Sequence, residues 1–231
     1  MGRFVLEISV ESVERAAAAE RGGADRIELC AELAVGGLTP SEELMRAVRA
    51  CVKLPIFAMV RSRAGDFVYS REEFAAMRAS IELAKRLEME GVVLGLLTAN
   101  GLVDVARTRE LVELAKPLPV TFHRAFDECA NQVAALEDVI HTDAGRVLTS
   151  GGAASAPAGA EMLAKLVAAA GERITILPGA GIHAGNIAEV ARSTGAREFH
   201  SGLSSVLARS ADVRQFEKEV GRLVETLRGV E

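Results

Sequence analysis

Residues 121–127 combine three side chains that could perform chemistry: His123, Arg124 and Asp127 follow a short apolar run directly. In parallel α/β folds, ligand sites lie at the carboxyl ends of the strands, where polar side chains of this kind converge. Because an unperturbed imidazole titrates near neutral pH, we expect His123 to act as a general acid or base. Asp127 is the candidate catalytic carboxylate beside it.

Two carboxylates lie inside apolar segments instead of after them. Glu7 is flanked by Leu6 and Ile8, and Glu28 is flanked in the same way by aliphatic residues. An isolated buried charge is very unfavourable, so each carboxylate needs a partner or a proton. Structural ion pairs are one interpretation. A catalytic site that also includes His200 is the other, and we favour it because charges are rarely retained in an interior for stability alone.

Arginines and glycine-bearing turns suggest that the ligand is an anion. Three such turns follow the last predicted strands, and backbone N–H groups in turns of this kind bind phosphate in many barrels. Glycine in these turns would also be explained by tight packing alone. The predicted anion-binding residues are Arg61, Arg63, Arg124, Ser150, Gly151, Gly152, Gly179, Gly181 and Ser201.

Strand-like and helix-like segments alternate along the whole chain and would position these residues. Strands are predicted over residues 4–9, 26–30, 54–60, 92–97, 119–123, 146–149, 174–178 and 198–200. Apolar spacing of three and four residues predicts helices over residues 13–21, 41–51, 71–88, 105–116, 132–141, 158–170, 184–193 and 213–228. Eight such pairs predict a single TIM-like (β/α)8 barrel domain over residues 1–231. The alternative is a doubly wound open sheet, which favours a glycine-rich turn after the first strand; no glycine stands there.

Composition agrees with an α/β core and excludes some partners. Hydrophobic residues make up 49% of the 231 residues, aromatic residues only 4%, and tryptophan is absent. A core of alanine, valine, leucine and isoleucine is typical of helices packed on a parallel sheet. The net charge of −5 comes without a basic stripe, so we expect no nucleic-acid partner. No apolar run reaches the roughly 18 residues of a membrane helix, so we expect no membrane partner.

Three cysteines, Cys30, Cys51 and Cys129, stand apart from one another without a C-x-x-C pair. An odd number of cysteines, with no apolar secretion segment after Met1, predicts reduced thiols and a cytoplasmic location. Thiolates favour soft ions such as Cu(I). The spacing matches no closed metal motif, however, and a buried thiol often acts as a small hydrophobic group. The role of Cys129 stays open.

Five segments carry distinctive motifs: residues 22–30 (GGADRIELC), 36–41 (GGLTPS), 59–69 (MVRSRAGDFVY), 121–127 (TFHRAFD) and 146–152 (RVLTSGG). Together they resemble the CutC family of copper-homeostasis proteins. The chain departs from the family pattern at Ser62 and Ala64, which replace proline and glycine, and after His200. The resemblance implies a TIM-like barrel, a cytoplasmic location and a link to copper handling.

Two hypotheses about function follow. In the first, the protein binds or traffics Cu(I), with Cys30 and Cys51 as the soft ligands. In the second, it is a lyase or isomerase that acts on a small phosphorylated or carboxylated substrate. The catalytic residues would then be Glu7, Glu28, His123, Asp127 and His200. A dimeric scaffold with a vestigial site is a third possibility, and in each case we expect a homodimer or a higher homo-oligomer.

Overall fold

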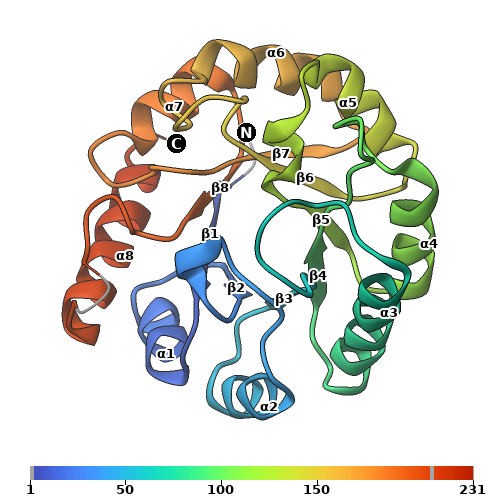
Figure 1. Ribbon diagram of the computed structural model, residues 1–231. Coiled ribbons are helices and arrows are strands. Elements are labelled where there is room, and N and C mark those ends of the chain that lie inside the picture. Colours follow the sequence, from blue (N-terminus) through green and yellow to red (C-terminus); the bar gives the residue numbers. More distant parts are fainter. Residues whose placement is uncertain (1–2, 209–210, 231) are drawn as a thin grey trace.

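The structure is a computed structural model that describes residues 3–208 and 211–230; the two ends of the predicted domain and residues 209–210 lie outside this range. Among the described residues, eight strands alternate with eight α-helices (Figure 1). The strands are Val5–Val10 (β1), Arg26–Leu29 (β2), Ile56–Met59 (β3), Gly91–Leu94 (β4), Val120–Phe122 (β5), Arg146–Thr149 (β6), Thr175–Pro178 (β7) and Glu198–Ser201 (β8). The helices are Val13–Arg21 (α1), Glu42–Cys51 (α2), Arg71–Arg86 (α3), Val105–Ala115 (α4), Gln132–Ile140 (α5), Ala160–Ala170 (α6), Ile187–Thr194 (α7) and Val213–Arg228 (α8).

The strands form one parallel sheet that rolls into a nearly closed barrel, as the alternation of elements predicts. Backbone pairing runs in the order β7-β6-β5-β4-β3-β2-β1-β8. The helices form an outer ring around the strands (Figure 1). Within the described residues, no ladder joins β7 to β8, and side chains fill this seam. A Cβ added at Gly179, after β7, would lie 3.4 Å from the Cβ of His200 on β8.

Helix starts follow local hydrogen bonding. Ser12, Ser41 and Ser70 each accept a backbone N–H of the first helical turn, and Ser70 forms a complete capping box with Glu73. The helix predicted from residue 184 begins later, at Ile187. The Asn186 side chain accepts the N–H of residue 183 and donates to the carbonyl of residue 181, which holds the preceding residues in a turn.

Strand alternation separates two layers of side chains. Odd and even positions of a strand point to opposite faces. On β2, Ile27 belongs to the large cluster between the barrel and its helices. The lumen holds a second, smaller apolar cluster, formed by Cys30, Phe57, Met59 and Val93. The charged residues of the strands share the lumen with this cluster.

Small residues leave room for large ones inside the barrel. A Cβ at Gly91 would lie 2.5 Å from the Phe57 ring, and a Cβ at Gly95 would lie 2.5 Å from the His123 ring. The sequence predicts a strand over residues 92–97. In the structure it begins one residue earlier, at Gly91, where the absence of a side chain leaves room for Phe57. It ends at Leu94, and the following residues turn away to an isolated bridge between Leu97 and Val103. In the described part of the chain, no helix is long and apolar enough to cross a bilayer.

Candidate active site

Three predicted residues, Glu7, Glu28 and His200, come together in the lumen. Glu7 lies on β1, between its two neighbouring strands: Glu28 lies on β2 and His200 on β8. All three side chains are buried. His200 Nδ1 lies 2.7 Å from Glu7 Oε1, and His200 Nε2 lies 3.9 Å from Glu28 Oε2. The imidazole thus bridges two carboxyl groups that are far apart in the sequence.

A series of ion pairs in the lumen holds the Glu7 carboxylate in place. Arg26 Nε donates to Glu7 Oε2 at 2.5 Å, and the same guanidinium reaches Glu198 at 2.8 Å. Arg146 donates to Glu198 from the other side at 3.0 Å. The sequence analysis did not identify Arg26, Arg146 or Glu198. The available signal was alternation: Arg26 stands two residues before Glu28, and Glu198 stands two before His200, so each pair shares a face.

The environment moves the pKa values of the two carboxyl groups in opposite directions. Burial alone would raise the pKa of Glu7, but Arg26 and His200 outweigh it and lower the pKa to about 2. Burial raises the pKa of Glu28, and the negative charge of Glu7 adds to this, although His200 opposes it. For His200, the nearby carboxyl groups outweigh burial and raise the pKa. Two carboxyls whose pKa values are separated in this way are typical of acid–base sites.

Glu28 is incompletely hydrogen-bonded. Cys30 Sγ lies 3.4 Å from Glu28 Oε2, whereas Glu28 Oε1 is buried and meets no partner among the described residues. A buried polar atom without a partner is unfavourable by about 1–3 kcal/mol, so each one calls for an explanation. Glu28 lines a cavity, so a ligand could supply the missing hydrogen bond.

The same three residues have the donor types of a metal site. One ligand atom each from Glu7, Glu28 and His200 lies within 4.8 Å of the others. Both oxygens of Glu7 are already engaged, however, one by His200 and one by Arg26. A cation would have to displace one of these partners, so the arrangement suits proton chemistry better than metal binding.

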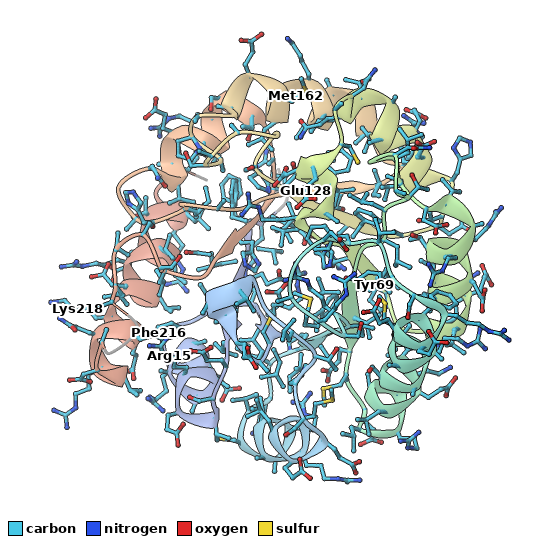
Figure 2. All side chains as sticks on the ribbon, viewed as in Figure 1. Arg15, Tyr69, Glu128, Met162, Phe216 and Lys218 are labelled. Atoms are coloured by element: carbon cyan, nitrogen blue, oxygen red, sulfur yellow. The ribbon has the colours of Figure 1, made fainter. Side chains whose placement is uncertain are left out.

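The cavity lies at the carboxyl ends of the strands and has a volume of about 710 Å³. Glu28, His200 and Met59 form part of its floor, and loops after most of the strands form its walls. On one wall, Arg15 lies over the Phe216 ring, 5.2 Å from the centroid; Glu128 stands on another wall (Figure 2). A volume of this size suits a small organic ligand.

His123 directly follows β5 and also lines this cavity, with only 4% of its surface exposed. Its Nδ1 accepts the backbone N–H of Ala125 at 3.2 Å, and its Nε2 has no partner in the described chain. Burial, followed by the positive charge of Arg61, lowers the pKa of His123 to about 3. The ring is therefore neutral at neutral pH, and the general acid or base role of His123 stays a prediction.

Two arginines predicted to bind an anion hold loops instead. Arg61 donates to the carbonyls of Val35, Gly37 and Gly65, and only its Nε is left without a partner. Arg63 pairs with Asp66 and Glu73 at 2.7 and 2.6 Å and also donates to backbone carbonyls. These contacts order the loop between β3 and α3.

The loop after β6 already surrounds an anion, the Asp127 carboxylate. Asp127 lies on a 3-10 segment, Arg124–Glu128, that directly follows β5. Its oxygens accept hydrogen bonds from the hydroxyls of Thr149 and Ser150 and from the N–H groups of Ser150 and Gly152. Gly151 donates to Thr149. The predicted phosphate loop is thus occupied by a side chain of the protein itself.

The remaining predicted anion ligands lie where β7 and β8 end. Gly181 lines the cavity, and its N–H meets no acceptor within residues 3–208 and 211–230. Gly179 donates to the carbonyl of Thr149, and the Ser201 hydroxyl donates to the carbonyl of Ile182. Arg124 is half exposed on the cavity wall and pairs with Asp127 at 2.8 Å.

The structure does not bring Cys30 and Cys51 together. Cys30 follows β2 at the cavity end of the barrel and is buried, whereas Cys51 ends α2 and is exposed. Because α2 runs back antiparallel to the strands, its last residue lies at the opposite end of the barrel. Burial, then the Glu28 carboxyl, raise the pKa of Cys30 well above its ordinary value. Burial raises the pKa of Cys129 to about 11.

A soft donor that the sequence analysis missed lies beside Cys30. A Cβ added at Gly37 would lie 3.0 Å from Cys30 Sγ and 3.3 Å from Met59 Cε, so the thiol and the terminal methyl group of Met59 both face this glycine, and the two residues belong to one cluster. Met59 stands two residues before Arg61 on β3, and this spacing was the available signal for its inward direction.

A parallel (β/α)8 barrel with buried acid–base groups at the carboxyl ends of its strands defines the class of this protein. The CutC family model matches residues 4–205, so the chain belongs to the CutC family. A CutC family protein from Chromobacterium violaceum is 48% identical over 211 residues, which cover 91% of this chain and 85% of that protein. One from Vibrio vulnificus is 49% identical over 205 residues, covering 87% and 82%.

A solved structure agrees with this assignment. The proposed copper homeostasis protein CutC from Streptococcus agalactiae superposes with a TM-score of 0.82 at 29% identity. The match covers 86% of this chain and 98% of that one. Both the barrel predicted from the alternation of elements and the resemblance to the CutC family are confirmed.

Proposed function

We propose that this protein is a barrel enzyme of the lyase or isomerase type that moves protons on a small phosphorylated or carboxylated substrate. The observation that carries the proposal is Glu28, a buried carboxyl group with one unpartnered oxygen that lines the 710 Å³ cavity. A carboxyl group whose pKa is raised by burial holds a proton more readily than an ordinary carboxylate, so Glu28 could both accept and return one.

Glu7 and His200 would hold Glu28 in position, and their own charges would not change during the reaction. Because Arg26 keeps Glu7 ionised, the Glu7–His200 pair stays fixed while Glu28 gains or loses its proton. His200 Nε2 faces Glu28 Oε2 at 3.9 Å, close enough to stabilise the carboxylate electrostatically.

Arg124 and Gly181 are the groups best placed to hold the acidic part of a substrate. Both line the cavity, and Arg124 is only partly neutralised by its contact with Asp127. Guanidinium and backbone N–H groups bind carboxylate and phosphate well. Arg61 and Arg63 would also order the loop between β3 and α3, which lies along the cavity.

The test is a screen of small carboxylated and phosphorylated metabolites in deuterated buffer, followed by proton NMR. Conversion, or exchange of a carbon-bound proton, is expected with the wild type and should be lost in Glu28→Gln, which keeps the shape but removes the acid. Glu189→Gln, on the exposed face of α7, is the matched control. Turnover that is equal in wild type and Glu28→Gln would refute the proposal.

Cu(I) binding at Cys30 is a second candidate, favoured by the contact between this thiol and Met59. Thiol and thioether sulfurs are the donors that Cu(I) prefers. The name of the S. agalactiae relative links that protein to copper homeostasis. A role of this kind would place the protein in the cytoplasm, where thiols stay reduced.

An anaerobic Cu(I) titration against a competing chelator tests this second candidate. Stoichiometric Cu(I) binding that is lost in Cys30→Ser, weakened in Met59→Leu and kept in Cys51→Ser would support a copper site at Cys30, at the cavity end of the barrel. Loss in Cys51→Ser as well would indicate a site shared between thiols of different molecules. Weak Cu(I) binding with the same affinity in the wild type and in all three variants would exclude a copper site at these residues.

A further inference from the structure

The imidazole of His123 is held in one position by contacts on several sides. Its ring fills the space above Gly95, and the Phe67 ring packs against it with the centroids 4.9 Å apart. Phe67 belongs to the loop between β3 and α3 that Arg61 and Arg63 order. His123 is 4% exposed, so bulk water does not compensate for a missing hydrogen bond.

The hydrogen bond at Nδ1 determines where the ring carries its proton. Since the N–H of Ala125 donates to Nδ1 at 3.2 Å, Nδ1 must be the acceptor nitrogen. A neutral imidazole then carries its hydrogen on Nε2. Nε2 is the atom that has no partner in the described chain, so this N–H is a buried donor without an acceptor.

Arg61 supplies a second donor of the same kind. Its Nε is also buried and has no hydrogen-bond partner among the described residues; its other nitrogens donate to backbone carbonyls, and the Tyr69 hydroxyl lies near the guanidinium. The Arg61 guanidinium lies over the Phe67 ring, 4.8 Å from the centroid, so Phe67 contacts both Arg61 and His123. Both residues line the cavity. Unpartnered N–H donors beside a cavity can stabilise a negative charge that develops on a substrate oxygen.

We propose that His123 donates its Nε2 hydrogen to the carbonyl oxygen of the substrate, with Arg61 Nε as the second donor, and that the substrate is a carbonyl compound with a hydrogen on the adjacent carbon. This inference rests on the proposed function and names its substrate class. The ionised Glu28 removes the proton from the carbon next to the carbonyl and becomes a carboxylic acid. The electron pair moves to the carbonyl oxygen, which becomes an enolate held by the two N–H donors. Glu28 then returns the proton to the same carbon. Where that carbon also carries a hydroxyl group, the hydroxyl proton can pass to the enolate oxygen and Glu28 can return its proton to the former carbonyl carbon, which leaves the new carbonyl on the adjacent carbon. Neither course needs an oxidant or a co-reactant.

Nitrogen-15 NMR of histidine-labelled protein tests the state of the ring, with the His123 signals assigned by comparison with His123→Gln. We expect Nε2 to be protonated and Nδ1 unprotonated from about pH 5 to about pH 8, because the ring is already neutral in this range. An imidazolium ion at neutral pH, or a proton on Nδ1, would overturn the proposal.

Binding of oxalate, a planar dianion that resembles an enolate, tests the role of the ring. Oxalate should bind to the wild type with saturation and shift the Nε2 proton downfield. His123→Phe, which keeps a ring without a donor, should weaken binding on the order of tenfold or more. His123→Gln offers an amide donor and should restore part of the affinity. No saturable binding, or equal affinity in wild type and His123→Phe, would overturn the assignment.

The two proposals fail separately. If turnover depends on Glu28 but His123 is protonated on Nδ1, or oxalate binds equally well to wild type and His123→Phe, the carbonyl assignment is wrong. The proposed function then still holds. Turnover that is equal in wild type and Glu28→Gln would remove the proposed function, and the assigned enolisation step with it.

Discussion

Replacing His123 with glutamine should make the stability of the protein less sensitive to acid. In the folded chain the pKa of His123 is about 3, against an ordinary value of 6.5. Between these two values the unfolded chain binds a proton that the folded chain does not. Stability is therefore fully present above the unfolded pKa and falls as the pH falls towards the folded pKa.

The size of the effect follows from these two pKa values. Between about pH 7 and about pH 4, a histidine with a pKa of 6.5 when unfolded and about 3 when folded lowers the free energy of unfolding by about 3 kcal/mol. Glutamine has no such proton. The difference in stability between these two pH values should therefore be about 3 kcal/mol smaller in His123→Gln than in the wild type.

Urea unfolding followed by circular dichroism at several pH values measures this difference. His123→Gln is also expected to change stability at neutral pH, so the slope with pH is the quantity to compare. Val93→Ala is the matched control. It removes volume from the same lumen without removing a titratable group, and should lower stability at every pH while keeping the slope of the wild type.

Parallel pH profiles for wild type and His123→Gln would refute the reasoning. They would mean that His123 binds its proton equally well in the folded and unfolded chains, and that neither burial nor Arg61 disfavours the imidazolium ion. A smaller slope in Val93→Ala as well would show that loosening the lumen, and not the imidazole, sets the acid sensitivity.

Three further predictions concern neighbouring groups. Glu7→Gln should lower the free energy of unfolding at neutral pH by about 3–5 kcal/mol in urea experiments, because Arg26 loses its buried partner. Phe67→Ala should raise the pKa of His123 from about 3 towards 6.5 in an NMR titration, since burial is the largest cause of the shift; an unchanged pKa would contradict this. Asp127→Ala should lower stability by about 1–3 kcal/mol, and inorganic phosphate should restore part of the loss in a thermal unfolding assay where chloride does not.

The sequence was sufficient to predict the barrel because its signals are local. Strand alternation and helical spacing located all eight strands and all eight helices, and two helices, Val13–Arg21 and Val213–Arg228, have the predicted bounds. Each helix start depends on a side chain only a few residues away, such as Ser70 and Glu73. The differences lie at element ends, where tertiary packing decides, as at Gly91 beside Phe57.

The site was predictable only in part, because partner choice is not local. Residue types drew attention to Glu7, Glu28, His123 and His200, which all lie in the lumen or on the cavity wall. Which carboxylate would be ionised depends on Arg26, a residue that the sequence analysis did not consider. The state of His123 likewise depends on a backbone N–H and on burial, neither of which its residue type reveals.

The absence of a ladder between β7 and β8 makes the barrel a rolled sheet with two edges that meet. Within the described residues, no strand ladder joins these two edges. Separating any other pair of neighbouring strands would break the backbone hydrogen bonds of their ladder. Because the loops after both strands line the cavity, parting the edges widens its entrance. Separation along this line would break side-chain contacts, among them the hydrogen bond from the Ser201 hydroxyl to the carbonyl of Ile182, but none of the strand ladders.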